Sequence, residues 1–197
     1  MPDKVDQKTS SPGESKGTNW GIIAIVAVSV IFVTFLVLSM FNSRTNRPDG
    51  VAPDFEMQFF DGYEWKDLPN ADLSDFQGHP VVLNFWASWC VECIREAKLL
   101  EDLWKEYEDQ GVVFLGIAYI DVEKNSLQYL EDYNVTYPNA PDLRTAISSK
   151  YDITGVPETF FIDKNGDVEY IHLSAVDESM VRTLVDKMLA AEGPESS

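Results

Sequence analysis

The two cysteines of this chain, Cys90 and Cys93, are separated by only two residues. They follow closely on the continuous apolar run Val81–Trp86, which is typical of a buried strand. A helix that begins at Cys90 would place free backbone N–H groups beside the first sulfur, and such groups stabilise a thiolate. The sequence therefore predicts a dithiol that passes between the thiol and disulfide states.

In this arrangement Cys90 is expected to be the exposed thiol and Cys93 the partly buried one. A thiolate at Cys90 would attack a substrate disulfide, and Cys93 would then break the mixed disulfide and release the reduced substrate. The alternatives are half of a zinc site or two inert buried cysteines. A tetrahedral zinc site needs four ligands, and the two histidines, His79 and His172, stand at no ligand spacing.

The region around the dithiol alternates strand and helix patterns. Apolar runs predict buried strands at Val81–Trp86 and 112–120, and amphipathic patterns predict helices at 90–110 and 122–133. This alternation favours an α/β fold with parallel strands joined by helices. The other expected elements are a hairpin with arms 55–60 and 63–68, a helical turn at 73–77, a loop at 137–141, a helix at 143–151, strands at 159–163 and 168–173 joined by a turn at 164–167, and a helix at 180–191.

The organisation of the whole chain follows from its length and composition. With 197 residues and 45% hydrophobic content, the chain can bury one full core. We expect a short disordered cytoplasmic tail at 1–19, a transmembrane signal anchor at Trp20–Phe41, a linker at 42–50, one globular domain at 51–192 and a tail at 193–197.

The segment Trp20–Phe41 carries no charge over 22 residues. A helix of that length, at about 1.5 Å per residue, spans the roughly 30 Å hydrocarbon core of a bilayer. A cleaved signal peptide is the alternative, but its apolar core is usually about 7–15 residues long. Residues 38–41 offer no Ala-x-Ala cleavage site. The sequence therefore favours an uncleaved anchor.

Basic residues on the two sides of this segment predict its orientation. Three lysines precede it and two arginines, Arg44 and Arg47, follow it closely. By the positive-inside rule, the excess of one basic residue before the segment favours a cytoplasmic N-terminus and an extracytoplasmic domain.

The net charge of −18 belongs entirely to the domain side of the chain, because residues 1–19 hold equal numbers of lysines and acids. Such a surface repels nucleic acid and anionic lipid headgroups and would attract a basic protein partner. The alternative is an acidic, solvated surface with no significance for a partner.

Four segments together resemble the membrane-anchored TlpA/ResA/CcmG (DsbE) group of thiol-disulfide oxidoreductases. They are APDF at 52–55, WASWCVEC at 86–93, GVPETFFID at 155–163, and the extra helix and loop between 122 and 152. The resemblance implies a thioredoxin-like α/β fold with an N-terminal β-hairpin extension and a central insertion. It also implies a domain outside the cytoplasmic membrane with no cofactor beyond its redox-active disulfide.

The same resemblance suggests a biological role. Proteins of this group usually act as reductants, notably of the Cys-x-x-Cys-His haem-attachment motif of apocytochromes c. The segment 157–160 is most similar to the cytochrome c maturation branch, so a disulfide-bonded protein, and apocytochrome c in particular, is the expected substrate. Electrons would come from a membrane donor of the CcdA/DsbD kind.

The Val156-Pro157 pair matches the cis-proline loop of thioredoxin-like proteins. This resemblance implies a cis bond facing the dithiol, with backbone groups offered to an extended substrate as in β-augmentation. Trp89, Val156, Pro157 and Glu158 are the residues expected to bind substrate. For Glu158, a surface residue with no role in binding is an equal alternative. Trp89 is either a packing residue at the edge of the active site or a contact for a partner protein.

Glu96 lies one helical turn after Cys93 and matches an acidic residue of the ResA and CcmG proteins. Asn84 occupies the strand position at which thioredoxin has a buried Asp, so Glu96 is the candidate base that would help Cys93 lose its proton. The alternative is a solvated helix residue. Glu92, between the cysteines, would raise the thiol pKa and bias the pair towards reduction.

Several other functions are alternatives to this one. A peroxidase of the AhpC/peroxiredoxin type needs Thr three residues before the attacking Cys, where this chain has Ala87. A Sco-like metal-delivery module has three residues between its cysteines and a distal His, for which His172 is a remote candidate. A general reductase or isomerase for other exported proteins, and a non-catalytic scaffold domain, are the remaining alternatives.

Overall fold

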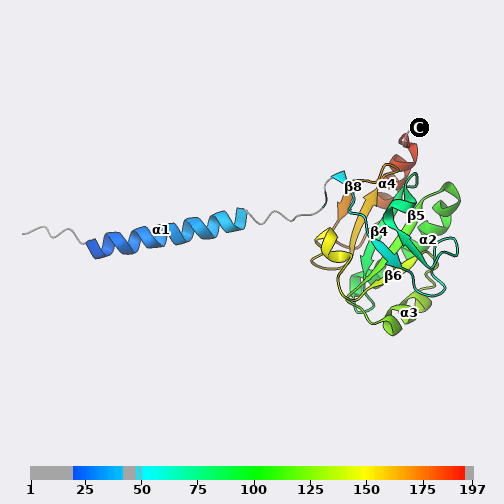
Figure 1. Cartoon of the computed structure of the whole chain (residues 1–197), viewed down its shortest axis with the longest axis horizontal. Coiled ribbons are helices and arrows are strands. Elements are labelled where there is room, and N and C mark those ends of the chain that lie inside the picture. Colours follow the sequence, from blue (N-terminus) through cyan, green and yellow to red (C-terminus); the bar gives the residue numbers. More distant parts are fainter. Residues whose placement is uncertain (1–19, 42–47, 49, 194–197) are drawn as a thin grey trace, which may run out of the picture. The chain divides into compact units, whose positions relative to one another are not determined.

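The computed structural model describes residues 20–41, 48 and 50–193 (Figure 1). These residues belong to two compact units, one ending at Arg44 and one beginning at Thr45. The predicted tail at 1–19, most of the predicted linker at 42–50 and all but the first residue of the predicted tail at 193–197 lie outside the described residues.

In the first unit, Trp20–Phe41 form the helix α1, so the prediction of a helix here is confirmed. Its side chains are described at Trp20 and at 24–35, and all of these are exposed. No helix in the described part of the chain is long and apolar enough to cross a membrane. The membrane-spanning role therefore stays a prediction.

The second unit is built on a six-stranded sheet in the order β1-β8-β7-β4-β5-β6. Strands β4, β5 and β6 are parallel, whereas the neighbouring pairs β1–β8, β8–β7 and β7–β4 are antiparallel. The strands are β1 (Gly50–Val51), β4 (Val81–Trp86), β5 (Val113–Tyr119), β6 (Asn139–Asp142), β7 (Glu158–Ile162) and β8 (Asp167–His172). The predicted parallel pair of β4 and β5 is confirmed.

Three helices cover one face of this sheet. They are α2 (Val91–Tyr107), which continues as η2 (Glu108–Gln110), α3 (Glu123–Asp132) and α4 (Glu178–Ala190). Their apolar side chains form one core with alternate residues of the central strands, such as Val82 and Phe161. The other face carries Leu83 and Phe160 and packs against the N-terminal segment 52–76 and residues 147–153. Every residue of β4 is buried, which explains why the strand is apolar except at Asn84.

The predicted hairpin is wrong in its second arm. β2 (Glu56–Gln58) pairs with β3 (Asn70–Asp72), and η1 (Leu73–Phe76) follows directly. The turn after Phe60 does form, since the Tyr63 N–H donates to the Phe60 carbonyl at 3.0 Å. The Phe60 N–H, however, donates to the Asn139 carbonyl at 2.9 Å, and the Asn139 N–H donates to the Tyr63 carbonyl at 3.1 Å. The turn is thus also bonded to the edge of the main sheet, and residues 63–68 do not pair with 55–60.

The same contacts correct the predicted loop at 137–141, because Asn139–Asp142 form the edge strand β6. The helix predicted at 143–151 is also wrong, and only its last turn exists, as η3 (Ser148–Tyr151). The Asp142 carboxylate accepts from the N–H groups of Ile147 (3.1 Å) and Ser148 (2.7 Å). These bonds bring residues 147 and 148 back to Asp142, so the segment between them forms turns and not a continuous helix.

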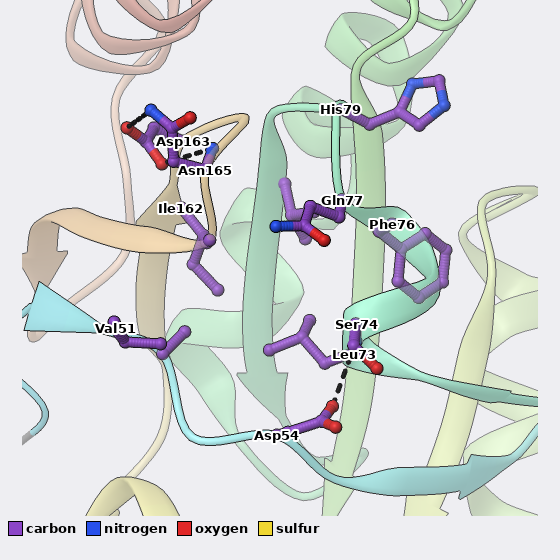
Figure 2. Close-up of a pocket in the computed structure, with 13 residues that line it drawn as sticks. Val51, Asp54, Leu73, Ser74, Phe76, Gln77, His79, Ile162, Asp163 and Asn165 are labelled. Atoms are coloured by element: carbon purple, nitrogen blue, oxygen red, sulfur yellow. Dashed lines mark hydrogen bonds between the residues drawn. The ribbon is translucent and has the colours of Figure 1, made fainter. Parts of the chain in front are cut away.

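A half-open cavity of about 150 Å³ lies where β4 begins (Figure 2). Its wall includes Val51, Val81 and Ile162, and the Asp54 carboxylate nearby accepts from the Ser74 N–H at 3.0 Å. The dithiol follows the opposite end of β4, so this cavity is not part of the candidate site.

Candidate functional site

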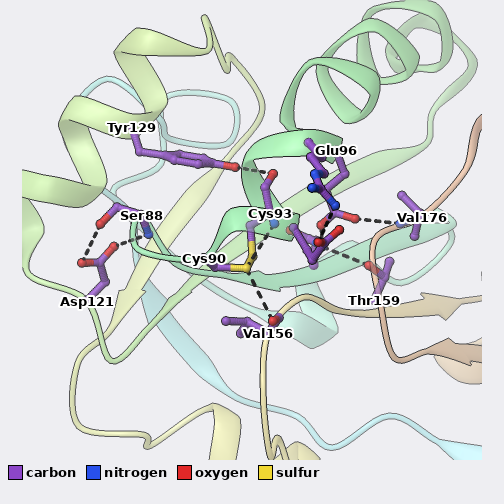
Figure 3. The surroundings of a disulfide bond; sticks show 12 residues. Ser88, Cys90, Cys93, Glu96, Asp121, Tyr129, Val156, Thr159 and Val176 are labelled. Atoms are coloured by element: carbon purple, nitrogen blue, oxygen red, sulfur yellow. Dashed lines mark hydrogen bonds and ion pairs between the residues drawn. A yellow bond between two sulfur atoms is a disulfide. The ribbon is translucent and has the colours of Figure 1, made fainter.

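Cys90 and Cys93 form a disulfide at the start of α2, directly after β4 and its short connection (Figure 3). Cys90 is the N-cap residue, and its sulfur accepts from the Cys93 N–H at 3.1 Å. The helix start therefore points a backbone donor at the first sulfur, as the sequence predicted. Cys90 is 5% exposed and Cys93 is 0% exposed, so Cys90 is the more accessible of the two but less exposed than expected.

The loop before β7 explains the low exposure of Cys90. The Val156 carbonyl oxygen lies 3.4 Å from the Cys90 sulfur (Figure 3). The Val156-Pro157 peptide bond is cis, which confirms the prediction. The cis-proline loop thus faces the dithiol and covers the attacking sulfur on one side.

Glu158 lies beneath this loop, and its side chain is turned away from solvent. Its residue exposure is 3%, and its Oε1 atom accepts from the N–H groups of Thr154 at 3.1 Å and Gly155 at 3.3 Å. The carboxylate therefore holds the backbone of the loop that ends in Pro157. This geometry suits a positioning residue.

Trp89 directly precedes Cys90 in the chain and is 59% exposed. Its indole N–H lies 3.4 Å from the Ile120 carbonyl oxygen. The ring is therefore open to a partner molecule while one edge rests on the segment that follows β5.

Glu96 is buried one turn after Cys93 and is only 2% exposed, so the solvated alternative is wrong. The Asn84 amide donates to its Oε1 atom at 3.0 Å, and the Val176 N–H donates to its Oε2 atom at 2.8 Å (Figure 3). Burial raises the pKa of Glu96 to about 7, although both hydrogen bonds lower it, and the charge of Glu92 adds a smaller rise. A carboxyl group with that pKa exchanges its proton at neutral pH.

Glu92 lies on the exposed side of α2 and forms an ion pair with Arg95 at 2.6 Å. The pair offsets part of the negative charge between the cysteines. The influence of Glu92 on the dithiol stays a prediction.

Asp121 is a residue of this site that sequence reasoning missed. It is 4% exposed, and its carboxylate accepts from the Ser88 N–H at 2.7 Å and the Ser88 hydroxyl at 3.0 Å (Figure 3). The same group accepts from the Val122 N–H at 2.8 Å. Asp121 therefore ties the connection before Cys90 to the start of α3. The sequence did contain a signal for this role. Asp121 follows the strand parallel to β4, and the carboxyl ends of parallel strands lie at the same edge of a sheet as the dithiol.

Tyr129 supports the dithiol from α3. Its hydroxyl donates to the Cys93 carbonyl at 2.9 Å, and its ring stacks on Trp86 with centroids 4.3 Å apart. The Trp86 indole N–H in turn donates to the Asn139 side chain at 2.8 Å. This amide occupies space that Gly116 leaves open, since a β-carbon at 116 would lie 1.9 Å from the Asn139 oxygen.

The contacts of the two histidines do not indicate a metal site. His79 Nδ1 lies 2.7 Å from the Gly111 carbonyl oxygen, and His172 Nε2 lies 2.8 Å from the Ser174 hydroxyl. Within the described residues, no group of three or more His, Cys, Asp or Glu side chains is arranged to hold a metal ion.

Comparison with known proteins gives consistent matches. The model of the AhpC/TSA family matches residues 48–171. The thiol-disulfide oxidoreductase ResA of Oceanobacillus iheyensis is 32% identical over 150 residues, which cover 75% of this chain and 77% of the relative. The thiol:disulfide interchange protein DsbE of Vibrio cholerae is 30% identical over 178 residues, covering 86% of this chain and 93% of the relative.

Solved structures agree with these matches. A thiol:disulfide interchange protein of the thioredoxin family from Chlorobium tepidum superposes with a TM-score of 0.62 at 25% identity. The match covers 74% of this chain and 99% of the other. The thioredoxin-like fold predicted from the sequence is therefore confirmed.

Proposed function

Because the chain belongs to the AhpC/TSA family and is a thiol-disulfide oxidoreductase of the ResA and DsbE type, we propose that it is a membrane-tethered reductant of protein disulfides. Its proposed substrate is the disulfide of the Cys-x-x-Cys-His motif in apocytochrome c. The observation that carries a reducing role is the buried Glu96, whose pKa of about 7 suits a base one helical turn from the second cysteine.

The first step uses Cys90. Its thiolate, stabilised by the start of α2, attacks one sulfur of the substrate disulfide, so an intermolecular disulfide forms and the substrate bond breaks. The other substrate sulfur leaves as a thiolate and takes a proton from solvent.

The second step uses Cys93 and Glu96. The ionised Glu96 takes the proton of the Cys93 thiol, and the resulting thiolate attacks the Cys90 sulfur. The mixed disulfide breaks, the substrate leaves fully reduced, and the protein keeps the Cys90–Cys93 disulfide. A membrane donor of the CcdA/DsbD kind then returns two electrons to this pair.

The cis-proline loop is the proposed docking edge for the substrate backbone. The Val156 carbonyl lies 3.4 Å from the Cys90 sulfur, and the backbone at this residue is the proposed group for pairing with an extended segment. Glu158 acts through its bonds to the preceding backbone, and Trp89 offers an exposed ring beside the reacting sulfur.

The proposed tether is α1, retained as a signal anchor with the N-terminus in the cytoplasm. Support comes from its 22 uncharged residues and the excess of one basic residue before it. This location would put the dithiol in the compartment where exported proteins acquire disulfides.

The test traps the mixed disulfide in cells. A full-length Cys93→Ala variant keeps the attacking thiol but cannot complete the second step, so we expect it to accumulate covalent adducts with apocytochrome c. The adducts are identified by mass spectrometry and must disappear on reduction. The matched Cys90→Ala variant lacks the attacking sulfur and is expected to capture nothing.

Two results would overturn parts of this proposal. Adducts with other exported proteins but none with apocytochrome c would replace the proposed substrate with a general reductase role. A Cys93→Ala variant that forms no adduct at all would contradict the direct exchange mechanism.

A further inference from the structure

The sequence contains one triplet of the form Asn-x-Thr, at Asn134-Val135-Thr136. No other Asn of the sequence has Ser or Thr two positions later. In exported proteins such a triplet is the acceptor for N-linked glycans when its middle residue is not Pro and its Asn lies on the surface. A modification here therefore depends on where the fold places Asn134.

Asn134 lies in the turn that ends α3, and it is exposed. Its N–H donates to the Glu131 carbonyl at 3.1 Å, and the N–H of Val135 donates to the Leu130 carbonyl at 2.9 Å. Backbone groups alone therefore close this end of the helix. The side-chain amide of Asn134 makes no hydrogen bond to any residue that the structure describes.

The backbone conformation at Asn134 does not by itself require Asn. Its φ angle is +52°, in the left-handed region in which helices commonly end on Gly. Gly adopts this conformation at the lowest cost, and Asn is the next most tolerant residue. Because the fold makes no use of the Asn134 amide, this group is available for a reaction with a molecule outside the chain.

Asn134 is remote from the dithiol. Asp121, which binds Ser88 beside Cys90, precedes α3, whereas Asn134 follows the other end of this helix. The helix has 10 residues, and a helix of that length is about 15 Å long. A bulky group on Asn134 is therefore compatible with disulfide exchange at Cys90.

Thr136 determines when the triplet can be recognised. In the folded domain its hydroxyl donates to Oε1 of the buried Glu101 and its N–H donates to Oε2, each at 2.7 Å. A transferase that recognises the triplet needs this hydroxyl, which Glu101 already binds. The triplet is therefore open to the enzyme before α2 packs against it, while the chain is being exported.

We propose that Asn134 is N-glycosylated during export, before the domain folds. The inference rests on one part of the proposed function, the extracytoplasmic location of the domain. The donor is an oligosaccharide linked to a lipid diphosphate. The Asn134 amide nitrogen attacks the first carbon of the sugar and forms an N–C bond. The bond from that carbon to the diphosphate oxygen breaks, the lipid diphosphate leaves, and one amide proton passes to a base of the transferase.

The test uses the full-length protein purified from membranes of the cells that naturally produce it. Mass spectrometry should find one oligosaccharide on the peptide that contains Asn134, with sugar ions released on fragmentation. Asn134→Gly should lose the glycan and the corresponding shift on gel electrophoresis. This variant should fold and keep its rate of disulfide exchange, because Gly suits the positive φ angle and the position is remote from Cys90.

Two changes at Thr136 form a matched pair. Thr136→Ser keeps the hydroxyl of the triplet and should keep the glycan, whereas Thr136→Val should lose it although Asn134 is intact. Asn165→Gln alters an exposed Asn outside the triplet and should leave the glycan in place. A glycan that persists in Thr136→Val would overturn recognition through the triplet.

The timing is tested in vitro with the purified transferase of the same cells and its lipid-linked donor. Unglycosylated protein that has already folded should react at least about tenfold more slowly than a synthetic peptide of residues 129–139, because Glu101 must first release Thr136. Equal rates would overturn the order in which glycosylation precedes folding.

Protease treatment of intact spheroplasts checks the location of the domain independently. A domain that the protease reaches but that carries no glycan on Asn134 would overturn the inference alone. A domain protected from the protease would instead contradict the extracytoplasmic location on which the inference rests.

Discussion

Two glutamates of α2 are both buried yet have different surroundings. Glu96 is 2% exposed and Glu101 is 4% exposed. The donors to Glu96, the Asn84 amide and the Val176 N–H, are both neutral. Glu101 accepts from the Thr136 N–H and hydroxyl, each at 2.7 Å, and also pairs with the Lys105 ammonium at 2.9 Å.

This difference shows how one helix can hold, five residues apart, a carboxylate paired with a cation and a carboxyl group with a pKa near neutrality. A cation beside a buried carboxylate offsets part of the cost of removing its charge from water. At Glu101 that arrangement ties α2 to the segment before β6. At Glu96 only neutral donors stabilise the buried charge. The cost of removing this charge from water therefore raises the pKa of Glu96 to about 7.

The largest expected effect is on the pH dependence of stability. Burial raises the pKa of Glu96 from 4.5 to about 7, so the folded protein binds this proton more tightly than the unfolded chain. The resulting stabilisation is complete below about pH 4.5 and is lost as the pH rises through 7. Relative to Glu96→Gln, the oxidised protein should lose roughly 3 kcal/mol across this window.

Denaturant unfolding of the oxidised protein at several pH values measures this loss. Glu101→Gln is the matched control for placing an uncharged amide at the other buried glutamate of the same helix. If Glu96→Gln and the unchanged protein showed the same slope, the contrast between the two glutamates would be wrong.

A smaller effect is expected from Glu101→Ala. The change leaves the Thr136 N–H without its acceptor and removes the ion pair, so the free energy of unfolding should fall by about 2 kcal/mol. The rate of disulfide exchange by the folded protein should stay the same. Asp102→Ala, which removes only an exposed pair with Lys98, serves as the control and should cost less than about 1 kcal/mol.

These two measurements also separate the roles. A Glu101→Ala variant that stayed as stable as wild type would show that this carboxylate does not anchor the helix. A change in its exchange rate would instead connect Glu101 to the dithiol.

The smallest expected effect comes from Asn84→Ala. The Asn84 amide lowers the pKa of Glu96, so its removal should raise that pKa further. The pH profile of the second exchange step, followed by rapid mixing, should move towards higher pH. Thr159→Val removes the other hydrogen bond of Asn84 but leaves its bond to Glu96, and it should not move the profile. Identical profiles for both variants would contradict the role of the amide.

The long central elements were predictable because their own sequences determine them. The continuous apolar run of β4 and the amphipathic pattern of α2 need no information from elsewhere in the chain. The short strand β6 was missed because it is stabilised by hydrogen bonds to β5 and to the turn after Phe60, and not by its own sequence. Its residue Asn139 completes a turn that begins at Phe60, and no local pattern signals that contact.

The site divides in the same way. Cys90, Cys93 and Glu96 were predictable because they share the first turns of one helix, where spacing fixes position. The Val176 N–H that binds Glu96 comes from a residue 80 positions later, and Asp121 lies 33 positions from Ser88. Contacts over such distances depend on the folded topology, which spacing in the sequence does not encode.

Gly116 limits how this protein can change over evolutionary time. A β-carbon at this position would lie 1.9 Å from the Asn139 oxygen and 2.8 Å from the Trp86 indole nitrogen. Even alanine therefore displaces the amide that binds Trp86, the ring on which Tyr129 stacks beneath the dithiol. Any side chain at 116 therefore requires both the Asn139 amide and the Trp86 ring to shift, so the packing beneath the dithiol depends on glycine at this position.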